Sequence, residues 1–114
     1  MSGLMDYSLC DQTVTLYQKR EDGVHRQVLD RAFLVTEHRL AEEVPGDHRR
    51  VRFTLIVPDG TLRLRPGDRV YEGEGPVCTD WASFLPGAVP GLMQMEYVIP
   101  YRWNGGITHW EAGA

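Results

Sequence analysis

The sequence has little lysine, little cysteine and no long apolar run. Of its 12 cationic residues, 11 are arginine and only Lys19 is lysine, and 16 Asp and Glu residues bring the net charge to −4. A protein whose whole surface binds nucleic acid is normally basic, because affinity comes largely from neutralising phosphates. The charge balance therefore predicts that the protein does not bind nucleic acid tightly.

The apolar and cysteine content exclude further classes of protein. No apolar stretch approaches the roughly 20 residues of a transmembrane helix, and the start, MSGLMDYSLCDQ, lacks the basic and long apolar regions of a secretory signal. We therefore expect no membrane association. The two cysteines, Cys10 and Cys78, do not have the spacing of a metal or redox motif, so we expect two free thiols.

Motifs that carry catalytic chemistry are also missing. There is no G-x-S-x-G nucleophile motif, no H-E-x-x-H or C-x-x-C metal motif and no phosphate-binding glycine loop. The histidines are far apart in the sequence, at His25, His38, His48 and His109. We expect no catalytic residue, no cofactor and no metal site, and hence a protein that is not an enzyme.

What the sequence does contain is turns. Gly, Pro, Asn and Asp cluster at 21–23, 45–47, 58–60, 66–68, 86–91 and 104–106, and most of the segments between them alternate in polarity. This spacing is typical of a small β structure. We predict a single mainly β domain over residues 1–114, an antiparallel barrel or sandwich of about 6–8 strands with at most one or two short helices. Expected elements are strands at 13–20, 24–43 (long and bent) and 67–76 and a short helix at 79–85.

An Asp-Gly pair in DHRRVRFTLIVPDGTLRLRP (47–66) predicts a hairpin with a two-residue turn that pairs Val57 with Leu62. In that register one face is apolar. The opposite face carries Arg50, Arg52, Arg63 and Arg65. Two interpretations stay open: a solvated face balanced by neighbouring carboxylates, or a positive stripe that docks on an acidic protein surface or contacts DNA phosphates.

A second hairpin is predicted in MEYVIPYRWNGGITHWEA (95–112), with a two-residue turn at Asn104-Gly105. That register gathers on one face Tyr97, Ile99, Tyr101, Trp103 and Trp110, and on the other Arg102, Ile107, His109 and Glu111. Because a buried aromatic side chain removes roughly 150–250 Å² from water, we favour a core role for the aromatic face. The alternative is an exposed platform formed by Tyr101, Trp103 and Trp110, which could stack bases or anchor a protein partner.

Three stretches together resemble an uncharacterised family of short prophage proteins, encoded among the minor capsid and head–tail joining genes of long-tailed phages. They are TVTLYQKREDGVHRQVLDRAFL (13–34), PGDRVYEGEGP (66–76) and GGITHWEAGA (105–114). The segment TDWASFLPGAVPGLMQ (79–94) departs from the family's pattern because it is longer and richer in proline. The 66–76 stretch is also similar to a turn of cupin barrels, but the histidine-rich strand motif of that family is missing.

The resemblance implies a structural role in virion morphogenesis, as a minor capsid, head–tail connector or tail component. The expected partners are other virion proteins (portal, head-completion or tail proteins), and the protein could form a homo-oligomeric ring through one repeated interface. It would be made in the bacterial cytoplasm and become part of the virion. The alternative function is a small β-barrel module that binds a ligand or nucleic acid through the aromatic platform.

Overall fold

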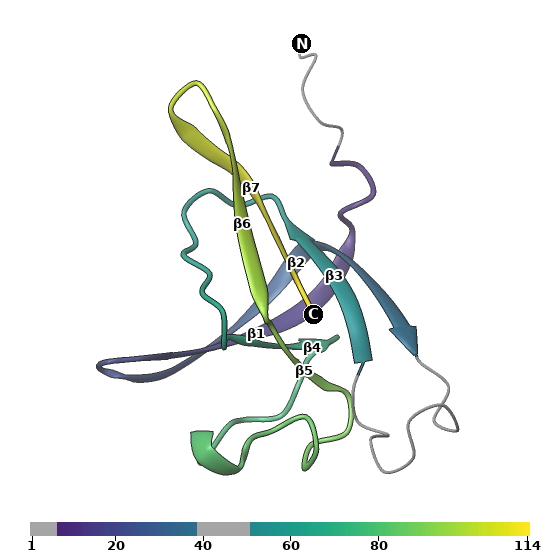
Figure 1. Cartoon of the computed structure of the whole chain (residues 1–114), viewed down its shortest axis with the longest axis vertical. Helices are drawn as coiled ribbons and strands as arrows, with labels where there is room; N and C mark the ends of the chain where they lie inside the picture. Colours follow the sequence, from purple (N-terminus) through teal and green to yellow (C-terminus); the bar gives the residue numbers. More distant parts are fainter. Residues whose placement is uncertain (1–6, 39–50) are drawn as a thin grey trace.

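The computed structural model describes residues 7–38 and 51–114. These residues are mainly β: seven antiparallel strands form one sheet that curls into a half-barrel (Figure 1), which confirms the predicted class and number of strands. The strands are β1 (Gln12–Arg20), β2 (Gly23–His38), β3 (Val51–Val57), β4 (Arg69–Glu72), β5 (Leu92–Gln94), β6 (Tyr97–Trp103) and β7 (Gly106–Gly113). The only helical element in the described residues is a single 3-10 turn, η2 (Trp81–Ser83). No described helix has the length and hydrophobicity needed to cross a membrane.

The strands lie in the order β5-β4-β1-β2-β3-β7-β6, and β2 is the longest. The first half of β2 pairs with β1 and its second half pairs with β3. The long strand predicted from residue 24 is thus confirmed as far as His38, and residues 39–43 lie outside the described residues. Because β2 belongs to both halves of the sheet, its course determines how the sheet curls.

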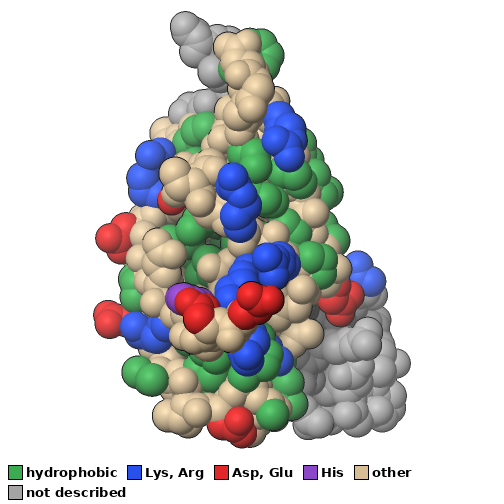
Figure 2. All heavy atoms as spheres, turned by 90° about the vertical axis from the view of Figure 1, so that its left-hand side faces the viewer, with side chains coloured by type: hydrophobic (Ala, Val, Ile, Leu, Met, Phe, Trp, Pro, Cys, Tyr) green, Lys and Arg blue, Asp and Glu red, His purple; other side chains and the backbone are tan. Residues whose placement is uncertain are grey.

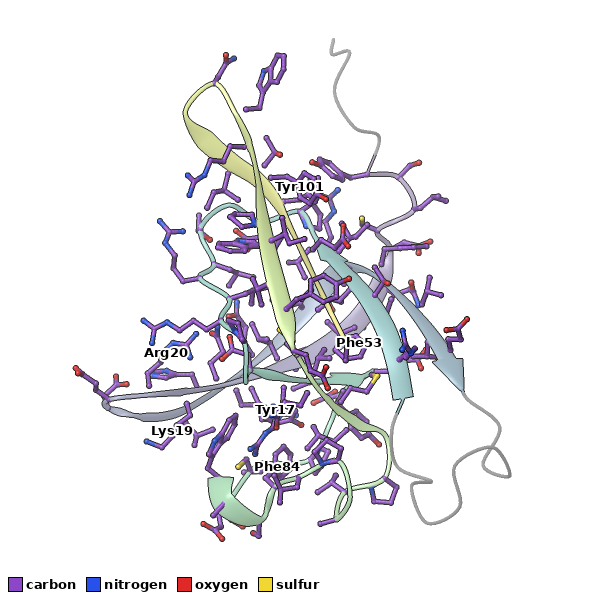
Figure 3. All side chains as sticks on the ribbon, viewed as in Figure 1. Tyr17, Lys19, Arg20, Phe53, Phe84 and Tyr101 are labelled. Carbon is purple, nitrogen blue, oxygen red and sulfur yellow. The ribbon has the colours of Figure 1, made fainter. Side chains whose placement is uncertain are left out.

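Strand β1 is buried on both faces. Val14 and Leu16 belong to the main core inside the curl, whereas Tyr17 packs against Phe84 in a second cluster on the opposite face. Figure 3 shows Tyr17 and Phe84 close together below the sheet. The Tyr17 hydroxyl donates to the carbonyl of Pro76 at 2.6 Å, so the buried phenol keeps a hydrogen-bond partner.

Arg69 ties the segment after β4 to the sheet. Its guanidinium is buried and donates to Gln94 Oε1 at 3.0 Å, to the carbonyl of Trp81 at 2.8 Å and to the carbonyl of Phe84. It also lies 3.7 Å from the centre of the Trp81 ring. Burial lowers the pKa of Arg69 from its ordinary value, and the three acceptors offset the cost of burying the charge.

The predicted hairpin at Asp59-Gly60 is wrong. Strand β3 pairs with β2 and β7, and residues 58–66 form no strand. The Asp59 carboxylate accepts hydrogen bonds from the Thr61 amide and hydroxyl, so residues 59–61 form a local turn that the Asp59 side chain stabilises. Val57 takes Trp110 of β7 as its partner. Leu62 and Leu64 point into the core as the alternation predicted, although from an irregular segment.

Candidate docking surface on the β6–β7 hairpin

Strands β6 and β7 form a hairpin that projects from the half-barrel (Figure 1). Its turn consists of Asn104 and Gly105, with φ values of 53° and 81°. Positive φ at both central residues is the requirement of a type I′ turn, which Asn-Gly satisfies at little steric cost. The predicted two-residue turn is therefore confirmed.

Shortly after the turn, β7 contains one residue more than the segment of β6 with which it pairs. Arg102 lies opposite Ile107, but Tyr101 lies opposite His109, so Thr108 is the extra residue of a β-bulge. The Thr108 hydroxyl donates to the Tyr101 carbonyl at 3.1 Å. Because side chains alternate along a strand, one inserted residue exchanges the faces of everything that follows it.

The bulge overturns part of the predicted aromatic face. Trp110 is 6% exposed and belongs to the main core as predicted, but Trp103 is 56% exposed, so the core prediction for Trp103 is wrong. The predicted set splits because the bulge turns Trp110 inward and leaves Tyr101 on the outer face, where its ring stacks on His109. The three-residue platform of the alternative interpretation does not form, since Trp110 is buried.

The outer face of the hairpin now contains Tyr97, Ile99, Tyr101 and Trp103 of β6 with His109 and Glu111 of β7, a set that we call the hairpin face. Alternate residues of β6 supply its apolar part. Ile99 is 41% and Tyr101 is 40% exposed. Figure 3 shows Tyr101 on the projecting hairpin, above the body of the half-barrel. The hairpin face continues across the sheet from β6 to β2, because Ile99, Glu111, Ile56 and Phe33 are successive cross-strand neighbours.

Glu111 organises the polar atoms of the hairpin face. The Tyr97 hydroxyl donates to Glu111 Oε2 at 3.0 Å and the Tyr101 hydroxyl donates to Glu111 Oε1 at 3.1 Å. Burial, followed by the Glu111 carboxylate, raises the pKa of Tyr97, and the hydrogen bond to Glu111 raises the pKa of Tyr101. Both phenols therefore stay neutral donors near neutral pH, and the two rings are held in place around one carboxylate.

His109 lies under this network, covered by the N-terminal segment. The Tyr101 ring stacks on the imidazole with centroids 4.5 Å apart and an angle of 12° between the planes. The Tyr7 hydroxyl is 2.7 Å from Nδ1 of His109. Burial lowers the pKa of His109, and the nearby Glu111 opposes this with a smaller effect. The sequence-based expectation that His109 is left outside is wrong, because Tyr7 and Tyr101 bury it.

The predicted arginine face does not form as one stripe. Arg52 lies on β3 opposite Glu37, and Arg50 lies outside the described residues. Arg63 lies instead beside Arg20, which donates to the Arg63 carbonyl at 2.9 Å and pairs with Asp68 at 3.0 Å. The Arg65 amide donates to the same Asp68 carboxylate at 2.9 Å. Figure 2 shows Lys and Arg side chains spread over the face that carries the β1–β2 hairpin, with Asp and Glu among them.

Within residues 7–38 and 51–114, no group of three or more His, Cys, Asp or Glu side chains is placed to hold a metal ion. The chain matches no protein-family model, no curated protein and no solved structure. The most distinctive property of the hairpin face is a row of exposed apolar side chains on a projecting hairpin, next to a carboxylate that accepts hydrogen bonds from two tyrosines.

The two tryptophans of the hairpin provide a matched pair for substitution. We predict that Trp110→Ala lowers the free energy of unfolding by about 3–5 kcal/mol, because it empties a large site in the core. Trp103→Ala should change it by less than about 0.5 kcal/mol, as is usual for an exposed position. Urea unfolding followed by circular dichroism measures both values. Equal losses in the two variants would contradict the opposite orientations of these residues.

The buried imidazole predicts a pH dependence of stability. The pKa of His109 is lowered in the folded chain, so the folded state favours the neutral imidazole. The contribution of this neutral imidazole to the free energy of unfolding is fully present above the unfolded pKa of about 6.5 and is lost as the pH falls through the folded pKa. We expect the urea midpoint of the wild type to fall more between pH 7.5 and 5.5 (about one unit on either side of 6.5) than that of His109→Gln. Parallel curves for the two proteins would show that His109 does not titrate in this way.

Proposed function

We propose that this protein is a structural component of a bacteriophage or prophage virion, a minor capsid, head–tail joining or tail component, which acts by docking on neighbouring proteins and not by catalysis. The observation that carries the proposal is the hairpin face, where Ile99, Tyr101 and Trp103 are exposed side by side on one strand. The resemblance of residues 13–34, 66–76 and 105–114 to prophage proteins of the head–tail region supports the setting.

The chemistry of the hairpin face suits a protein interface. Aromatic side chains carry much of the binding energy in interfaces, since they bury a large area with few rotatable bonds. Tyr97 and Tyr101 are already oriented by Glu111, so little side-chain entropy is lost when a partner covers them. Contiguous apolar side chains on a solvent-exposed surface favour association with another protein, because burying them removes apolar area from water.

The proposed partners are other virion proteins such as portal, head-completion or tail proteins, together with further copies of the chain arranged as a ring. A ring needs only one repeated head-to-tail interface. The net charge of −4 would let DNA pass such a ring without tight binding, because like charges repel. In this proposal the chain is made in the bacterial cytoplasm and becomes part of the virion.

A second candidate is a nucleic-acid or ligand-binding module, favoured by the exposed Tyr101 and Trp103 on either side of Arg102. Stacking on exposed aromatic rings is sequence-tolerant and contributes roughly 1–3 kcal/mol per base. One face of the Tyr101 ring is already occupied by His109, however. Fluorescence titration with a single-stranded oligonucleotide distinguishes the candidates, since saturable quenching of tryptophan emission would favour the module over the virion component.

The proposal is tested by deleting the gene in an inducible lysogen that carries it. We expect induction to yield incomplete particles by electron microscopy, with a titre at least about 100-fold lower, and the wild-type gene supplied in trans to restore it. Because Ile99 lies in the hairpin face, Ile99→Lys should fail to restore the titre. Val77→Lys makes the same kind of change at an even more exposed apolar residue outside the hairpin face and should restore it. An unchanged titre after deletion would refute the virion role.

A further inference from the structure

Trp103 is the most exposed member of the hairpin face. It is the last residue of β6 and immediately precedes the Asn104-Gly105 turn, so its indole is carried at the end of the hairpin. With 56% of the side chain exposed, the indole contributes little to the core. A large aromatic side chain at the end of a stiff hairpin suits insertion into a recess on another molecule.

The same chain offers a recess of suitable size. A hollow of about 370 Å³ opens on the outer face of β2 and β3 and reaches the base of β6, where it is lined by Val35, Glu37, Arg52, Thr54 and Tyr97 among others. This volume is at the low end of the roughly 300–1,000 Å³ of small-molecule sites. It is therefore large enough for one aromatic side chain but small for a cofactor.

The lining of the hollow is complementary to an indole. Val35, which is 48% exposed, supplies an apolar wall, and Arg52 and Glu37 lie directly opposite each other at its edge. A guanidinium stacks favourably on an indole face, as Arg69 does on Trp81 within this chain at 3.7 Å. A carboxylate such as that of Glu37 can accept the indole N–H.

The end of the hairpin and the hollow lie in different parts of the molecule. In Figure 1 the β6–β7 turn is at the top, whereas β3 begins in the lower half of the view, where Arg52 is its second residue. One copy can therefore give its Trp103 to a second copy while its own hollow stays open for a third. Such a head-to-tail contact generates a ring when the rotation closes and a filament when it does not.

We propose that Trp103 of one copy inserts into the hollow between Val35, Glu37 and Arg52 of a second copy, and that this contact repeats head to tail. The inference rests on the proposed function, because it specifies how copies of a virion component would assemble. In this arrangement the hairpin face has two partners: a second copy of the chain, which binds Trp103, and a neighbouring virion protein. Tyr101 and Ile99 remain available to the neighbouring virion protein.

The test is sedimentation velocity of the purified full chain from micromolar to millimolar concentration. The wild type should form dimers and larger species as the concentration rises. Trp103→Ala should weaken self-association by about 30-fold or more, the effect of losing an interface hot spot. Val35→Arg should weaken it similarly, because the new side chain fills the hollow and repels Arg52. Val28→Arg makes the same change at an exposed position of β2 away from the hollow and should associate like the wild type.

Mixing the two defective variants gives the decisive result. Trp103→Ala keeps an intact hollow and Val35→Arg keeps an intact Trp103, so the mixture should form a one-to-one dimer and nothing larger. A wild type that stays monomeric, a Trp103→Ala variant that associates normally, or a mixture that stays monomeric would each overturn the proposal. If Val35→Arg does not fold by circular dichroism, Arg52→Ala replaces it, since that change only shortens an exposed side chain.

The two proposals can fail separately. A monomeric wild type together with a defective gene deletion would overturn the head-to-tail contact and leave the virion role in place. A chain that associates through Trp103 while the deletion yields normal particles would overturn the virion role and leave the contact in place. The oligomeric state and the particle titre thus report on different claims.

Discussion

Thr108 adds one residue to β7 against β6, and the two faces of the hairpin exchange at that point. Between the bulge and the end of β7, Trp110 and Ala112 enter the core, whereas His109 and Glu111 lie on the same face as Tyr101 and Ile99, where Tyr7 and Tyr101 cover His109. Without the extra residue, Trp110 would lie on the same face as Tyr101. The bulge thus allows one short hairpin to contribute both to the core and to an exposed aromatic surface, because alternation alone would place all its aromatic residues together.

The rest of the fold supports that hairpin. Strand β3 holds β7 through the pair Val57–Trp110, and the long β2 connects this half of the sheet to β1 and β4. On the far side, Arg69 secures the segment around η2 through backbone carbonyls and the Trp81 ring. The hairpin face is therefore carried on an ordered sheet, which lowers the entropy lost when a partner binds.

The features that depend on neighbouring residues in the sequence could be predicted. Turn residues and alternation indicated a mainly β chain and the Asn104-Gly105 turn. Pairing between distant strands was not predictable: Asp59-Gly60 suited a hairpin, but β3 pairs with β7 because that contact buries Trp110 against Val57. The bulge at Thr108 left no distinct signal, so the orientation of Trp103 and the burial of His109 by Tyr7 were missed. A one-residue change in register reverses every later assignment.

The proposed virion role requires the hairpin face to be open in the free chain and covered in the assembled particle. Hydroxyl-radical footprinting of the purified protein and of intact particles, read by mass spectrometry, compares the two states residue by residue. We expect rapid oxidation of Trp103 and Tyr101 in the free chain, strong protection of both in the particle, and protection of Trp110 in either state. Equal oxidation of Trp103 in the free protein and in the particle would contradict this role.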